Sequence, residues 1–301
     1  MTVTTPRPRW LSFVLGVGGG ALGLLPWLVG GGRMPLQNLW VVEVLPESMP
    51  FVLLPLSQYS AVLLFSLVLI GGIFGGLAVH VAGRRGGIAA WPGALGVLLV
   101  HVIAVVQSFG VLHGGLGLSG GGDTRAVLYF AGMLGGTFVA ALLAQLAFWM
   151  TSRRSAGVAS LGVALAAVPF ANWAMRWVVA FTGEALVPIW TTSVARWIPA
   201  VVVGLALVWC GVRPLWRLVV WVVALLALWI VPALYTAFSY GLGMRVLDGD
   251  VVEMMRAAAQ VFPMALGIEW LPVVVAAGIG VVGTVGRMLV GRGRRDEPRS
   301  S

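Results

Sequence analysis

The sequence predicts an all-α, polytopic integral membrane protein with about eight transmembrane helices in a single bundle. First, 59% of its 301 residues are hydrophobic and only 10% are charged, with a mean hydropathy of +0.99, whereas a soluble domain carries about 25% charged residues. Second, apolar runs of the ~20 residues that a spanning helix needs recur along the chain. Third, arginines gather at the ends of these runs on alternate connections, which indicates a fixed membrane orientation.

The first apolar run, residues 10–30, follows a short basic head at residues 1–9. Two arginines before an apolar run are typical of a secretion signal, but this run is longer than such signals and no small-residue cleavage motif follows. We therefore expect an uncleaved helix that is bent at Pro26. The next connection, residues 31–57, is long and partly apolar, and Pro46, Pro50 and Pro55 exclude a regular helix there.

Seven further runs predict the remaining spans, at residues 58–82, 91–112, 126–150, 158–181, 196–212, 218–240 and 266–289. The link at residues 241–263 contains an amphipathic stretch, which we expect to lie on the outer leaflet or on the bundle. The chain closes with an arginine-rich tail at residues 290–301. We treat residues 1–301 as one transmembrane domain, because no polar segment is long enough to form a second one.

The arginines predict that both ends of the chain are cytoplasmic. All 19 basic residues are arginine, and with eight spans and a cytoplasmic N-terminus most of them fall on the inner side. The inner set is Arg7, Arg9, Arg84, Arg85, Arg153, Arg154, Arg213, Arg217, Arg287, Arg292, Arg294, Arg295 and Arg299. Residues 31–57 and 241–263 then become the two large extracytoplasmic connections.

Composition also excludes several kinds of chemistry. Without lysine the chain has no Walker A loop and no Schiff-base cofactor. A single cysteine, Cys210, excludes internal disulfides and thiolate metal sites. We expect no metal, no cofactor and no nucleic-acid partner, since the positive charge marks topology. The expected partners are the lipid bilayer and either another membrane protein or a second copy of the chain.

Small residues at four-residue spacing predict where helix backbones approach one another. The pairs and triplets are Gly71/Gly75, Gly72/Gly76, Gly132/Gly136 and Ala276/Gly280/Thr284. We expect them to pack helices within the chain, with a homodimer face as the alternative.

The candidate site is built around Arg176, the only charged residue in the run 158–181. An arginine at the centre of a span costs roughly 2.5–3.5 kcal/mol on insertion scales, so the fold should compensate for it. Asn172 lies one turn earlier on the same face, and Pro169 frees a backbone carbonyl beside it. Arg176 is then either an anion-binding group in an outward-facing cavity, or an interfacial arginine that snorkels or pairs with Glu184 or Glu269.

Three other side chains complete the candidate set. Glu269 begins the last span, where a carboxylate either complements the helix macrodipole or carries a proton. His101 and Gln145 lie deep in the third and fourth spans, as packing residues or as the lining of a polar path.

Three functions remain open. The first is a transporter or permease, or a membrane subunit of one, with a polar cavity in the outer half of the fifth span. The second is a non-catalytic accessory or scaffold subunit of a membrane or cell-envelope complex. The third is an intramembrane enzyme acting on a lipid-linked substrate, with Glu43, Glu47, Asp248 or Asp250 as acids. A non-enzymatic role in the plasma membrane is favoured, and no catalytic residue is assigned.

Overall fold

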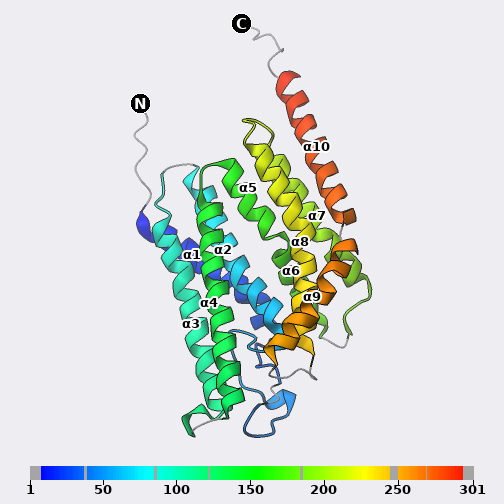
Figure 1. Ribbon diagram of the computed structural model, residues 1–301. Helices are drawn as coiled ribbons and strands as arrows, with labels where there is room; N and C mark the ends of the chain where they lie inside the picture. Colours follow the sequence, from blue (N-terminus) through cyan, green and yellow to red (C-terminus); the bar gives the residue numbers. More distant parts are fainter. Residues whose placement is uncertain are drawn as a thin grey trace.

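The computed structural model describes residues 8–36, 39–84, 87–120, 123–183, 186–244, 250–268 and 270–293 (Figure 1). Within these ranges the fold is all-helical, and the only β pairing is a single bridge between Arg33 and Phe51. Its α-helices are α1 (Arg9–Val29), α2 (Ala61–Gly83), α3 (Trp91–Gly115), α4 (Thr124–Ser152), α5 (Ala156–Leu165), α6 (Ala167–Thr182), α7 (Trp190–Cys210), α8 (Arg217–Gly243), α9 (Val251–Ile268) and α10 (Trp270–Gly293).

The helical, multi-pass membrane character predicted from the sequence is confirmed. Seven of the described helices are long and apolar enough to cross a bilayer, or eight spans result if the bent pair α5–α6 counts as one. Which face of the membrane each end meets stays a prediction. Following that prediction, we call the end of the bundle that holds Val29 and Gly115 the outer end, and the opposite end the inner end.

The starts of two spans differ clearly from the sequence-based positions. Helix α7 already begins at Trp190, and residues 266–268 belong to α9, so α10 begins at Trp270. Pro272 is the third residue of α10 and has no N–H to donate to the carbonyl of Ile268. The amphipathic stretch predicted in the outer link is α9. It packs on α8, because the Trp229 indole N–H donates to the carbonyl oxygen of Leu266 at 2.9 Å.

The helices form two groups that lie side by side (Figure 1). We call α1–α4 the first lobe, and α5 with α7–α10 the second lobe. Helix α6 contacts both, because it packs on α1 and α2 of the first lobe and on α7 of the second.

Glycines let the helices of the first lobe touch through their backbones. A Cβ atom added to Gly19 of α1 would lie 2.2 Å from the backbone nitrogen of Gly75 in α2. A Cβ on Gly72 of α2 would lie 2.2 Å from the carbonyl oxygen of Ala144 in α4. The predicted role of the small residues of α2 is therefore confirmed.

Not every small-residue pattern packs within the chain. In α10, Gly280 faces α7, where its Cβ position is 3.1 Å from the Leu207 side chain, as predicted. The prediction for Gly132 and Gly136 of α4 is wrong, since both are exposed and no atom lies within 4 Å of their Cβ positions. The spacing of these residues marks one face of α4, but that face points out of the bundle.

The outer connection folds back into the bundle. Its segment from Met49 to Ser57 is not α-helical, yet Val52 and Leu56 are completely buried. Side chains of α3 hold this backbone, because the Gln107 Oε1 atom accepts from the Leu53 amide and the Ser108 Oγ atom from the Leu54 amide, both at 2.9 Å. Irregular backbone is tolerated at this depth because protein groups satisfy it.

The turn that carries Arg153 and Arg154 lies at the inner end of the bundle. The turn after α4 meets the end of α2, where the His80 Nδ1 atom is 2.7 Å from the carbonyl oxygen of Arg153. Figure 1 shows the start of α1 and the end of α10 at this same end of the bundle. Arg217 and Arg287 donate to the carbonyls of Cys210 and Val208, which complements the C-terminal end of α7.

Candidate functional site

The fifth predicted span is broken near its middle. Helices α5 and α6 meet at Ala166 with an angle of 53° between them. Pro169 explains the break, because it has no N–H for the carbonyl of Leu165, the residue four positions earlier. Regular bonding resumes with the Phe170 amide, which donates to Ala166 at 2.8 Å.

Arg176 lies in the outer half of α6, and its guanidinium faces α1. Its Cζ atom is 5.1 Å from the centroid of the Trp27 ring, a cation–π distance. Its Nη2 atom is 3.5 Å from the Cβ position of Gly30, just past the last turn of α1, where carbonyl oxygens favour a cation. The compensation that the sequence demanded is therefore present at the C-terminal end of α1.

Trp27 joins three parts of the chain at this point. The indole is 5% exposed, its face contacts Arg176, and its Nε1–H donates to the carbonyl oxygen of Val52 at 2.9 Å. We call Trp27, Val52 and Arg176 the outer junction. It ties α1, α6 and the outer connection together.

Aromatic side chains continue the contact of α6 with the first lobe. Trp173 stacks on Phe170 at 5.7 Å between centroids and meets Phe74 of α2 edge to face at 5.1 Å. The Trp173 indole N–H also donates to the carbonyl of Gly23 in α1 at 3.0 Å. Helix α6 is therefore held to the first lobe by aromatic contacts and by the Trp173 hydrogen bond to α1, whereas α1 and α2 touch through their backbones.

Asn172 binds its own helix. Its Nδ2 atom donates to the carbonyl oxygen of Val168 at 3.4 Å, one turn earlier. The carbonyl that accepts this bond is therefore that of Val168, and not the Leu165 carbonyl that Pro169 leaves without a helical donor. The side chain lies on the face of α6 shared with Arg176, as the sequence spacing indicated.

His101 and Gln145 are not brought together. The His101 ring is 2% exposed, and neither ring nitrogen has a hydrogen-bond partner among the described residues. Gln145 donates to the carbonyl of Ala94 at 3.3 Å. Ala94 lies seven residues before His101 in α3, which is about 10 Å along the helix axis.

Glu184 and Glu269 lie outside the described residues, so their pairing with Arg176 stays a prediction. Among the described residues no three His, Cys, Asp or Glu side chains are close enough to hold a metal ion. Sequence reasoning did not identify Trp27 as part of this site. The position of Trp27 along its helix could have indicated this role. It lies two residues before the end of α1, and Arg176 lies in the corresponding outer half of the fifth span.

Comparison of the chain with protein-family models, curated proteins and solved structures gives no match.

Proposed function

We propose that the chain is a transporter or permease, or a membrane subunit of one, which moves a small or lipid-like solute along the boundary between its two lobes. The observation that carries this proposal is the break in the α5–α6 span, because α6 beyond the break packs on α1 and α2 of the first lobe and on α7 of the second. Discontinuous helices at a boundary of this kind are the usual solution for solute sites in transporters.

The contacts within the first lobe differ in kind from those that join α6 to it. The first lobe is locked by glycine contacts that leave no room for sliding, such as that of Gly19 with Gly75. Helix α6 instead meets this lobe through the rings of Trp173 and Phe74. A proline-broken helix between two packed lobes is suited to act as a hinge.

Arg176 would supply the attraction for an anionic group of the solute. A guanidinium is a good partner for carboxylate or phosphate, and here it is partly buried against the Trp27 ring, where its field is less screened than in water. Because the sequence carries no nucleotide-binding motif, the energy would come from an ion gradient or from a separate ATPase.

One observation favours the accessory role as a second candidate. Several polar side chains within the spans already bond to backbone carbonyls, as Gln145 does with Ala94, Asn172 with Val168 and Thr137 with Met133. Groups engaged in this way hold the bundle together and need no solute. The two roles differ in whether water reaches the α6 break.

Cysteine accessibility tests this difference without knowledge of the solute. Cys210 is the single cysteine and is buried, so Cys210→Ala gives a cysteine-free background. In this background Asn172→Cys is treated with a membrane-impermeant maleimide in sealed vesicles of either orientation. Alternating access predicts labelling from both sides. Leu142→Cys, on an exposed face of α4, is the unreactive control, and Val41→Cys in the outer connection should react from one side only.

The outcomes separate the candidates. Labelling of Asn172→Cys from neither side, with Val41→Cys reactive, would overturn transport and leave the accessory role. Arg176→Gln provides a second readout, since it should accumulate in the membrane like the Arg196→Gln control while solute movement is lost. Failure of Arg176→Gln alone to accumulate would make the arginine a structural residue.

A further inference from the structure

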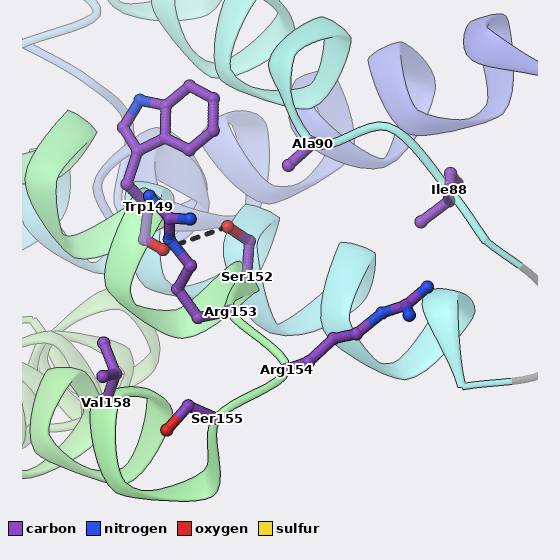
Figure 2. A pocket seen from close by; sticks show the side chains of 8 residues that line it. All are labelled: Ile88, Ala90, Trp149, Ser152, Arg153, Arg154, Ser155 and Val158. Atoms are coloured by element: carbon purple, nitrogen blue, oxygen red, sulfur yellow. Dashed lines mark hydrogen bonds between the residues drawn. The ribbon is translucent and has the colours of Figure 1, made fainter.

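A pocket opens at the inner end of the bundle, far from the outer junction. It has a volume of about 600 Å³ and is lined by the connection before α3 and by residues 149–158, which run from the last turn of α4 into α5 (Figure 2). This volume falls within the range of sites that bind small molecules and headgroups. The residues that form it lie at the end of α4, at the start of α5 and just before α3.

The polar side of the pocket is basic and carries no compensating charge. Arg153 and Arg154 are both exposed, and in the part of the chain that the structure describes no carboxylate lies within 4 Å of either. Figure 2 shows their side chains diverging from the turn, with Arg153 directed toward Trp149 and Arg154 toward the connection before α3. The Nη2 atom of Arg154 is 3.7 Å from the Cβ position of Gly87 in that connection.

Two other arginines at the inner end bind backbone carbonyls, and Arg153 and Arg154 differ from them in this respect. Arg217 donates to the carbonyl of Cys210 at 2.6 Å, and Arg287 donates to the carbonyl of Val208. Both therefore complete the end of α7. No hydrogen bond of this kind from the Arg153 or Arg154 guanidinium is found among the described residues, so both guanidiniums remain available to a ligand.

The start of α5 adds to the positive character of the pocket. Ser155 is the N-cap residue of α5, and its side chain makes no capping hydrogen bond. The first amides of a helix point toward its N-terminus and favour an anion there. The Ser152 hydroxyl donates to the carbonyl of Trp149 at 3.2 Å, which keeps that turn in place (Figure 2).

Apolar side chains complete the lining of the pocket. Ile88 and Val158 lie on opposite sides of the two arginines (Figure 2), and Trp149 has 37% of its surface exposed. Along α4, the turns that precede Trp149 expose Leu142 and Leu146 to the bilayer. Apolar side chains contribute nothing to the binding of a soluble anion, whereas a lipid would place its headgroup in the basic part and its acyl chains along α4.

We propose that this pocket binds the phosphate group of an anionic phospholipid, with Arg153 and Arg154 as its cationic ligands and Trp149 against the glycerol and upper acyl region. The shared chemistry is that of a phosphate ester, and the amphipathic lining favours a lipid as its source over free phosphate. Basic pockets between transmembrane helices are known to take such headgroups. The site does not depend on the transport proposal, since it lies at the other end of the bundle.

Native mass spectrometry of the full chain in detergent tests this assignment. The probes are phosphatidylglycerol, phosphatidylcholine and inorganic phosphate, each titrated separately. The wild-type chain should bind phosphatidylglycerol more tightly than phosphatidylcholine. The variant Arg153→Gln/Arg154→Gln should lose about tenfold or more in affinity for phosphatidylglycerol, because two charge-assisted contacts disappear.

Matched variants separate a pocket from general surface charge. Arg84→Gln/Arg213→Gln removes the same charge from exposed positions at the same end and should change the affinity by less than about threefold. Ser155→Asp is the second control for folding, because aspartate is a good N-cap and preserves α5, yet its charge repels phosphate. It should keep the wild-type unfolding temperature and lose phosphatidylglycerol binding.

Three results would overturn the proposal. The first is equal affinity of the wild-type chain for phosphatidylglycerol and phosphatidylcholine. The second is the same loss in the Arg84→Gln/Arg213→Gln control as in the pocket variant. The third is displacement of phosphatidylglycerol by millimolar inorganic phosphate, which would assign the pocket to a soluble anion.

Discussion

Two neighbouring glycines of α1 give a sharp test of the packing between α1 and α2. A Cβ on Gly19 would lie 2.2 Å from the nitrogen and 2.4 Å from the Cα atom of Gly75, whereas the Cβ position of Gly18 has no atom within 4 Å. The same substitution, glycine to alanine, can therefore be tested at two positions of one helix. The new methyl group meets the backbone of α2 at residue 19 and meets no atom at residue 18. We expect Gly19→Ala to destabilise the bundle and Gly18→Ala to leave it intact.

The size of the effect follows from the geometry. Ordinary carbon contacts begin near 3.5 Å, so Gly19→Ala must push α1 and α2 apart by about 1 Å, given the 2.2 Å approach. A gap of this size forfeits a quarter to a half of each dispersion contact along the interface, and overpacking of this kind costs about 1–3 kcal/mol. Both alanines gain the same helix propensity, about 0.5–1 kcal/mol, so the difference between the variants isolates the packing cost.

The assay is thermal unfolding of the purified full chain in one detergent, followed by tryptophan fluorescence because Trp27 and Trp173 lie close to the α1 interfaces. Gly18→Ala should unfold at or slightly above the wild-type temperature, and Gly19→Ala clearly below it. Equal unfolding temperatures for the two variants would refute the claim that α1 and α2 touch through their backbones.

Three further predictions concern other parts of the bundle. Gln107→Leu should destabilise the chain by about 1–3 kcal/mol in thermal unfolding, because the amide of Leu53 and the carbonyl of Phe51 lose their partner; an unchanged midpoint would contradict this. Pro169→Ala restores an amide at the α5–α6 break, so spin-label distances across it should lengthen as the 53° bend relaxes; identical distances would exclude proline as the cause. Gly136→Leu, at an exposed glycine of α4, should neither destabilise the chain nor alter its elution in size-exclusion chromatography; a shift to a smaller species would instead identify a homodimer face.

The fold class was readable from the sequence because bilayer thickness and charge placement act over whole segments. The finer packing was readable only in part. Four-residue spacing says that Gly72 and Gly76 share one face, and the same is true of Gly132 and Gly136, but spacing does not say which face points inward. Helix α2 is central and packs by both of its glycine pairs, whereas α4 turns its pair outward.

The candidate site shows a similar limit. The sequence singled out Arg176 because a charge in a span demands compensation. It did not identify Trp27 as a partner of Arg176, because the two residues are far apart in the chain and their contact depends on how α6 bends past Pro169. The carboxylates proposed as partners, Glu184 and Glu269, were chosen for charge alone, and an aromatic face was not weighed against them.

The bonds that hold the outer connection have a consequence for the order in which the protein can mature. The amides of Leu53 and Leu54 depend on side chains that are 54 residues later in the chain. During synthesis this segment leaves the ribosome well before its acceptors are made, so it cannot adopt its final conformation until α3 has been inserted. The first three long helices thus reach their final form together. A chain cut after α2 would lack the Gln107 and Ser108 side chains that bind the outer connection.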